Sequence, residues 1–213
     1  LDVGAHVDGY LGDTATTVEV GTRNWQPLIR AAERALEMAL EMAKDGVTVG
    51  TIGGVVERSI KEANLRPVVN LSGHEMKRYN LHAGLSIPNI DDGTLTKVRE
   101  NMLLAIEPFA TNGQGQVSNG RSGNIYRVLR DRPLKDPDAE RLFGRIKEEF
   151  TTLPFCERWC DRLQPNSGPL LRVLLRHGVI STYPVLVEAK QGMVSQAEHT
   201  VLVGNGRNEI TTA

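Results

Sequence analysis

Two aspartates flank a short turn signal near the start of the chain. Asp8-Gly9 is a strong two-residue hairpin signal, and β-prone runs over 2–7 and 10–20 lie on either side of it. A two-residue turn pairs Gly4 with Asp13, and it places Asp2 on the same face, about 7–8 Å or less from Asp13 between Cβ atoms. Two carboxylates held in this way repel each other unless a proton or a cation lies between them. A solvated hairpin with incidental acids is the alternative.

Three later residues add to this pair. His74 follows a strand in Ser72-Gly73-His74, Glu107 ends the apolar run 103–106, and Glu198 precedes the apolar strand 200–203. A lone acid inside a buried strand is costly unless it is paired or bound to a metal. Together the two Asp, one His and two Glu form an oxygen-rich set with a single imidazole. Such a set suits two divalent ions with a bridging water.

The first half of the chain contains the elements that must position these residues. Apolar residues recur at helical spacing from about Gln26 to Lys44, and Gly46 is placed to end that helix. Thr51 is the expected N-cap of a second helix that reaches about Ala63. Residues 67–72 and 102–111 are expected to form buried strands.

The second half changes character between about residues 124 and 184. Segments 138–150 and 168–177 have helical periodicity, and strand-like sequence resumes near Val185, over 198–203 and over 208–212. We therefore expect an α+β domain formed by residues 1–123 and 185–213. A helical, winged-helix-like insert of residues 124–184 would interrupt it.

Composition excludes several classes of protein. The chain has 25 basic and 26 acidic residues, so no strong field favours nucleic acid or an anionic membrane. No apolar run approaches the roughly 20 residues that span a bilayer, and no signal peptide is recognisable. The two cysteines, Cys156 and Cys160, are expected to be reduced thiols in a cytoplasmic protein.

The candidate residues lie in motifs that resemble those of methionine aminopeptidases, and specifically the type 2, archaeal-like branch. The resemblance spans essentially the whole chain. It is carried by the hairpin Asp2–Thr14, by Ser72-Gly73-His74 through His82-Ala83-Gly84 and Ile87-Pro88-Asn89, by Ala105–Ala110, by Leu153–Trp159 and by Gln196–Thr200. It implies the pita-bread fold, an antiparallel sheet backed by helices. It also implies a preceding N-terminal part, and we expect the sequence as given to lack it.

The resemblance assigns a role to each candidate. Asp2 would chelate one metal ion, Asp13 and Glu198 would bridge both ions, and His74 and Glu107 would complete the other. Glu107 would also act as general base and then acid, and His82 would hydrogen-bond the scissile peptide. Leu81 and Tyr183 would line the methionine pocket. The two ions would be Co, Mn, Fe or Zn, because all four tolerate such ligands.

The implied function is removal of the initiator methionine from nascent polypeptides when the second residue is small. We expect a monomer that acts on nascent N-termini, and we hypothesise that the insert shapes the substrate pocket through Tyr183 and contacts the ribosome. Two alternatives share the fold: a proline-specific dipeptidase or aminopeptidase, and a non-enzymatic RNA- or ribosome-binding relative that has lost metal ligands. The insert favours the type 2 enzyme over the first, and the five intact ligand positions argue against the second.

Overall fold

The computed structural model describes residues 1–213, and the chain divides into two compact units. The first consists of Leu1–Ser118 and Val187–Ala213, and the second of Asn119–Leu186. The chain passes between them within two strands, β8 (Val117–Val128) and β10 (Ile180–Glu188). No helix has the length and apolar character needed to cross a bilayer.

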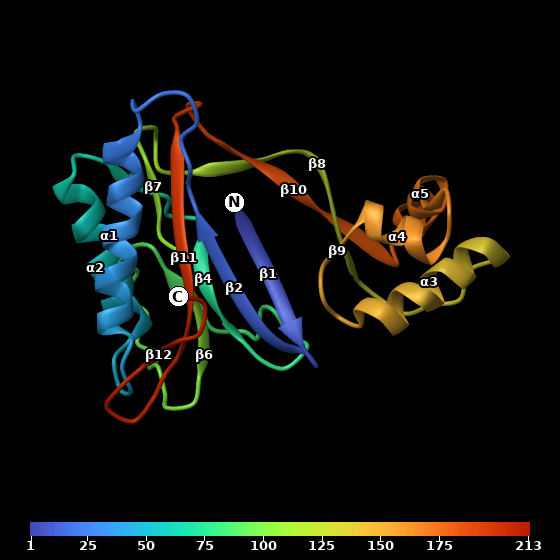
Figure 1. Cartoon of the computed structure of the whole chain (residues 1–213), viewed down its shortest axis with the longest axis horizontal. Coiled ribbons are helices and arrows are strands. Elements are labelled where there is room, and N and C mark those ends of the chain that lie inside the picture. The colour runs from blue at the N-terminus through green and yellow to red at the C-terminus, as the bar shows by residue number, and fades with distance from the viewer. The chain divides into compact units, whose positions relative to one another are not determined.

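The first unit is built on a nine-stranded sheet with antiparallel pairings. Its main path runs β1-β2-β11-β6-β4-β5, so strands from both ends of the chain meet at the centre (Figure 1). The strands are β1 (Asp2–Val7), β2 (Tyr10–Thr16), β3 (Arg66–Pro67), β4 (Ser72–Met76), β5 (Ser86–Pro88), β6 (Leu103–Ile106), β7 (Phe109–Thr111), β11 (Val194–Leu202) and β12 (Glu209–Ile210).

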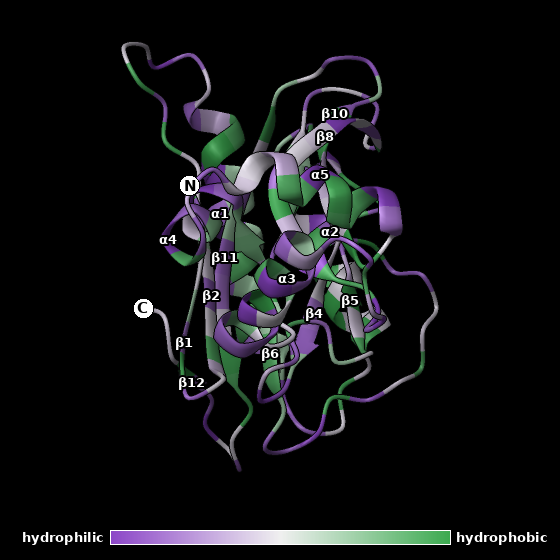
Figure 2. Ribbon diagram, turned by 90° about the vertical axis from the view of Figure 1, so that its right-hand side faces the viewer, coloured by the Kyte–Doolittle hydropathy of each residue, from purple (hydrophilic) through white to green (hydrophobic).

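Two helices, α1 (Gln26–Met42) and α2 (Val49–Glu62), cover one face of this sheet. Each helix is amphipathic, and its apolar stripe packs on the strands in one core that includes Leu36, Ile52 and Leu104. Figure 1 shows both helices on the same side of the sheet, and Figure 2 shows the hydrophobic colouring that runs along β6. The other face of the sheet is left without helices from this unit.

Several element boundaries differ from expectation. The cap of α2 is Thr48, whose side chain accepts a hydrogen bond from the Thr51 N–H, so the prediction of Thr51 as N-cap was wrong. The expected strand over 67–72 is replaced by β3 and β4, and the second strand of the hairpin ends at Thr16. The expected strand over 102–111 is two strands, with Glu107-Pro108 between them. Pro108 cannot donate to a ladder, which favours such a break.

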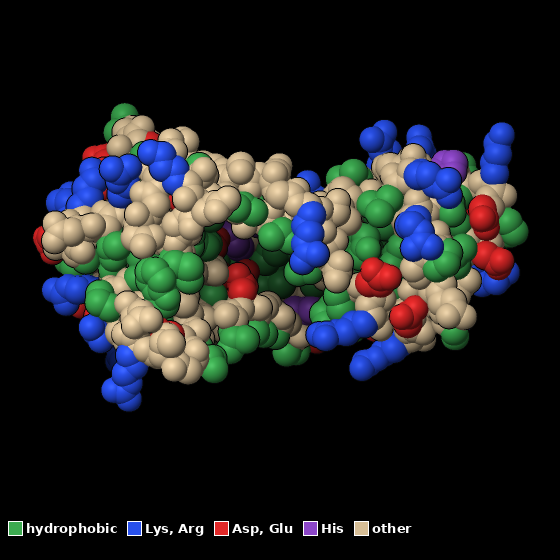
Figure 3. Space-filling model, turned by 90° about the horizontal axis from the view of Figure 1, so that it is seen from above, with side chains coloured by type: hydrophobic (Ala, Val, Ile, Leu, Met, Phe, Trp, Pro, Cys, Tyr) green, Lys and Arg blue, Asp and Glu red, His purple; other side chains and the backbone are tan.

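The second unit has a core of its own. It contains the helices α3 (Pro137–Phe150), α4 (Glu157–Leu163) and α5 (Ser167–His177), and the sheet β10-β8-β9 with β9 at Phe155–Cys156. Phe143, Phe155 and Leu174 are fully buried in it. Both cysteines are free thiols, as predicted. On the face seen in Figure 3, basic and acidic side chains of this unit are interspersed, with no continuous patch of one sign.

Candidate metal centre

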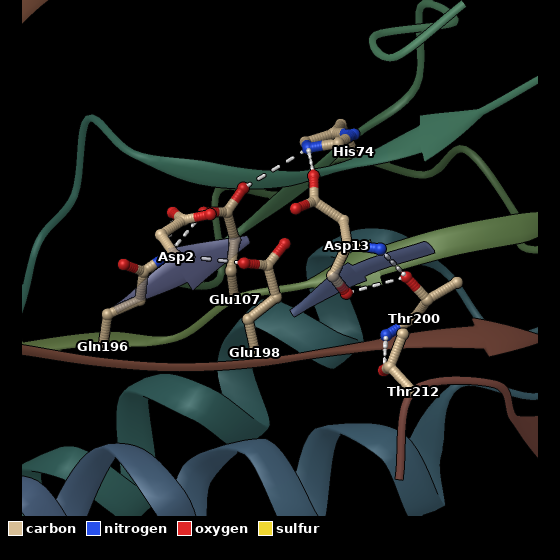
Figure 4. Close-up of polar contacts among 8 residues, drawn as sticks. All are labelled: Asp2, Asp13, His74, Glu107, Gln196, Glu198, Thr200 and Thr212. Carbon is tan, nitrogen blue, oxygen red and sulfur yellow. Dashed lines mark hydrogen bonds and ion pairs between the residues drawn. The ribbon is translucent and has the colours of Figure 1, made fainter. Parts of the chain in front are cut away.

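The five predicted ligands lie on the face of the sheet opposite α1 and α2. On β11, Ala197 and Val201 pack in the core beneath the helices. Side chains alternate along a strand, so Glu198 and Thr200 point to the other face. Figure 4 shows Asp2, Asp13, His74, Glu107 and Glu198 converging there, with the helices beneath the strands.

Strand register places the acids in one row across the sheet. Asp2 pairs with Ala15, and Ala15 pairs with Glu198. Glu107 directly follows Ile106, whose partner on β11 is His199, so Glu107 lies at the level of Glu198. Ala15 carries only a methyl group between Asp2 and Glu198. The row therefore has space above Ala15 for the longer acids on either side.

A second row, two residues further along the strands, supplies the other ligands. Asp13 pairs with Gly4, and His74 pairs with Ala105, which itself pairs with Thr200. Thr200 of β11 and Ala105 of β6 lie between Asp13 and His74 in this row, and Gly4 lies on the outer side of Asp13, where it has no side chain to cover the carboxylate. The hairpin register that places Gly4 opposite Asp13 agrees with the prediction made from Asp8-Gly9.

The separations between ligand atoms fit a shared cation. His74 Nε2 lies 3.8 Å from Asp13 Oδ2 and 3.7 Å from Glu107 Oε1, too far for hydrogen bonds. One ligand atom each from Asp13, His74 and Glu198 lies within 4.8 Å of the others. Ligands about 2.0–2.2 Å from one ion lie about 3–4 Å from each other, so the cluster is near the required size.

Burial makes this cluster electrostatically costly without a cation. Burial, followed by repulsion from neighbouring carboxylates, raises the pKa of Glu198 to about 9 and that of Glu107 to about 8. The same two causes raise the pKa of Asp13 to about 6. Burial, followed by the charge of His82, lowers the pKa of His74 to about 4. Each shift favours the less charged form of its group.

No lysine or arginine offsets this negative charge. Neither a lysine nor an arginine forms an ion pair with any of the four acids. Glu198 is only 1% exposed, and its Oε1 has no hydrogen-bond partner. Buried polar atoms normally have partners, so an orphaned carboxylate oxygen among three other acids is what a divalent cation would satisfy. The residues present fit a metal.

The remaining predicted site residues, His82, Leu81 and Tyr183, belong to different parts of the chain. His82 follows β4 in an exposed turn, and its ring centroid is 4.4 Å from that of His74, so it borders the cluster. Leu81 is half-buried in the same turn. Tyr183 belongs to β10 in the second unit, where the Arg127 guanidinium lies 5.4 Å from its ring centroid. The roles of these three residues stay predictions.

Two residues of β11 lie at the cluster without a role having been predicted for them. Thr200 Oγ1 accepts a hydrogen bond from the Asp13 N–H and donates one to the Asp13 carbonyl, both at 2.8 Å. The Gln196 side chain reaches the acids directly (Figure 4). Both residues share a face with Glu198 by strand alternation, and this period of two could have identified them from the sequence.

Comparison with known proteins assigns the family. Residues 1–205 match the model of metallopeptidase family M24. The methionine aminopeptidase of Methanocaldococcus jannaschii is 42% identical over 217 residues, covering 100% of this chain and 71% of the relative. That of Pyrococcus horikoshii is 45% identical over 219 residues, covering 100% of this chain and 72% of the relative. The chain thus spans about seven tenths of the length of these archaeal relatives.

Solved structures show the same fold at lower identity. A thermophilic Arx1 aligns with a TM-score of 0.77 at 18% identity, covering 95% of this chain and 63% of that one. The Thermotoga maritima methionine aminopeptidase aligns with a TM-score of 0.64 at 23% identity, covering 98% and 61%. The predicted α+β pita-bread fold and the predicted class of enzyme are confirmed. The sequence identity over the full chain and the fold together show that the chain belongs to the methionine aminopeptidases of metallopeptidase family M24.

Proposed function

We propose that Asp2, Asp13, His74, Glu107 and Glu198 hold two divalent ions, and that this centre removes the N-terminal methionine of nascent polypeptides. The observation that carries the proposal is the convergence of four acids and one imidazole on one face of the sheet. No lysine or arginine offsets their charge, and a buried oxygen of Glu198 has no partner. Co, Mn, Fe and Zn all suit such ligands.

The chemistry divides between the ions and the side chains. Bound divalent ions at such a site supply Lewis acidity, which lowers the pKa of water and polarises a carbonyl. Glu107 accepts the proton of the attacking water and passes it to the leaving amine. His82, beside His74, donates a hydrogen bond to the scissile peptide and stabilises the tetrahedral intermediate. Leu81 and Tyr183 line an apolar pocket for the flexible methionine thioether.

The test of this function is methionine release from a Met-Ala-Ser peptide by chelator-stripped protein reloaded with Mn²⁺ or Co²⁺. We expect release only in the presence of metal, with two ions bound per chain by elemental analysis. Glu107→Gln should lower kcat by about 10²–10⁴-fold, because it removes the proton carrier. An Ala-Pro peptide should stay intact, which separates this activity from that of a proline-specific enzyme.

Glu75→Gln is the matched control for Glu107→Gln. Glu75 is a buried glutamate next to His74, but it pairs with Lys77 at 3.0 Å instead of joining the cluster. We expect its substitution to leave methionine release within about twofold. An equal loss of methionine release in the two variants would contradict the role assigned to Glu107. Stoichiometric metal without release would mean that this chain builds the centre but not the substrate site.

The proposed setting is the cytoplasm, with a monomer acting on N-termini as they leave the ribosome. The second unit, Asn119–Leu186, is the candidate for ribosome contact because it folds around its own core. Replacing these residues with a short Gly-Ser linker should abolish ribosome co-sedimentation. If Tyr183 shapes the pocket, the same deletion should also raise the KM for peptide. Unchanged co-sedimentation would remove the docking role.

A further inference from the structure

Gln196 lies two residues before Glu198 on β11 and directs its side-chain amide into the acids of the cluster. Its Nε2 is 3.1 Å from Asp2 Oδ2, 3.3 Å from Glu107 Oε2 and 3.5 Å from Glu198 Oε2. The amide has two N–H donors for these three oxygens. It therefore joins acids from three separate segments of the chain, as the dashed lines from the Gln196 amide in Figure 4 show.

The amide contacts only one oxygen of each glutamate. Gln196 approaches Oε2 of both Glu107 and Glu198. The other oxygen of Glu107, Oε1, faces His74 Nε2 at 3.7 Å, and the other oxygen of Glu198 is buried without a partner. One oxygen of each carboxylate thus accepts a hydrogen bond from the amide, and the other oxygen is available to bind a metal ion.

The base of the Gln196 side chain is fixed on both edges of its strand. The Gln196 N–H donates to Thr17 Oγ1 at 2.8 Å, and the same hydroxyl donates to the Gln196 carbonyl at 2.9 Å. On the other edge, Gln196 pairs with Phe109 of β7. A side chain that starts from a fixed backbone loses little further freedom when its amide hydrogen-bonds the acids.

The Gln196 amide carries no net charge, and this matters as much as its position. A lysine or arginine at residue 196 would also hold the carboxylates, but its charge would offset theirs and compete with a cation. A neutral amide orients the acids and leaves their negative charge available. Hydrogen-bond partners of metal ligands commonly act in this way, and their loss costs about 10–100-fold in metal affinity.

We propose that Gln196 is a positioning residue of the metal centre, whose amide selects the oxygen that Glu107 and Glu198 present to the metal ions and holds Asp2 beside them. This rests on the proposed dinuclear centre. It assigns Gln196 no contact with substrate and no part in proton transfer.

The test is Gln196→Met, which keeps the length of the side chain and removes both donors. Binding of Mn²⁺ and Co²⁺ to chelator-stripped chain would be measured by calorimetry, and the Co²⁺ d–d absorption band would report ligand geometry. We expect metal affinity to fall by about 10–100-fold and the Co²⁺ band to shift. Affinity within twofold of the unmodified chain, with an unchanged band, would overturn the proposal.

Gln26→Met is the matched control, because Gln26 Nε2 also donates to a glutamate, Glu19 Oε2 at 3.2 Å, on a different part of the unit. It should leave metal affinity unchanged. An equal loss in both variants would mean a general effect on folding and would also overturn the proposal. If the unmodified chain binds no metal at all, the proposed function fails, and that outcome is distinct from failure of the role of Gln196.

A measurement on the unmodified chain covers the case in which Gln196→Met does not fold. With ¹⁵N labelling and Zn²⁺ as a diamagnetic ion, the Gln196 side-chain amide should show slow hydrogen exchange in the metal-loaded protein. Exchange as fast as that of an exposed glutamine such as Gln191 would show that the amide does not hold the acids, and would overturn the proposal.

Discussion

Three acids with raised pKa values at one site, Asp13, Glu107 and Glu198, give the metal-free protein an unusual dependence on pH. The pKa of Glu107 is raised to about 8 and that of Glu198 to about 9, both chiefly by burial. The folded chain therefore binds more protons than the unfolded chain between the ordinary glutamate pKa and these values. The free energy of unfolding must fall as pH rises through that interval.

This predicts a melting temperature that decreases between pH 7 and 8.5 in chelator-treated protein. His74, whose pKa is lowered to about 4, is neutral throughout this window and contributes no slope. Adding Mn²⁺ should raise the melting temperature most at the upper end, where the acids are ionised. Glu198→Gln should flatten the metal-free profile in differential scanning fluorimetry. A melting temperature that rises with pH in the chelated, unmodified chain would contradict the prediction.

At the scale of elements, the hairpin β1–β2 was the most predictable part of the site. Asp8-Gly9 determines the turn, and the turn determines the register that brings Asp2 and Asp13 to one face. The helices α1 and α2 were predictable because their apolar periodicity is strong. The strand β8 was not, because most of its residues are exposed and polar and show no alternation. The contacts of Gln196 depend on which strands become neighbours, and local sequence does not specify that.

The close approach of β4 and β6 gives a prediction about Gly73, which precedes the ligand His74. A Cβ at Gly73 would lie 2.3 Å from the Ala105 carbonyl oxygen, much closer than van der Waals contact. Gly73→Ala should push β4 away from β6, with a loss of about 1–3 kcal/mol in unfolding free energy. Because His74 moves with β4, metal affinity measured by calorimetry should fall as well.

Gly144→Ala is the control for Gly73→Ala. Gly144 lies inside α3, and a Cβ there would meet no atom within 4 Å. Alanine should stabilise this helix by about 0.5–1 kcal/mol and leave metal affinity unchanged. If Gly73→Ala bound metal as tightly as Gly144→Ala, the packing of β4 on β6 would not govern the position of His74.

At the scale of the whole molecule, the Glu188 carboxylate links two segments of the chain by hydrogen bonds. One segment precedes the point where the chain leaves the first unit, and the other follows the point where it re-enters. Its carboxylate accepts hydrogen bonds from the N–H groups of Gly115 at 3.1 Å, Lys190 at 2.7 Å and Gly192 at 2.9 Å, and also from that of Gln114. These bonds lower the pKa of Glu188, the Gly192 N–H most of all. The stability they provide is therefore lost as pH falls through that lowered pKa.

Replacing Glu188 with Gln should loosen both of these segments, because an amide NH₂ would face N–H groups that need an acceptor. We expect faster limited proteolysis within 112–116 and 188–193 and a lower melting temperature. Glu209→Gln, an exposed glutamate on β12, is the control and should change neither. Unchanged cleavage in Glu188→Gln would show that other contacts hold the two segments in place.

The proposed ligands come from five separate segments, with Asp2 on the first strand and Glu198 on β11. The two acids proposed to bridge the ions, Asp13 and Glu198, lie on β2 and β11, so no short fragment of the chain contains both. Folding dominated by such non-local pairing is slow, because the ends must meet before their contacts stabilise anything. The proposed centre is therefore complete only when β11 lies between β2 and β6, and we expect full metal affinity to appear only after that pairing.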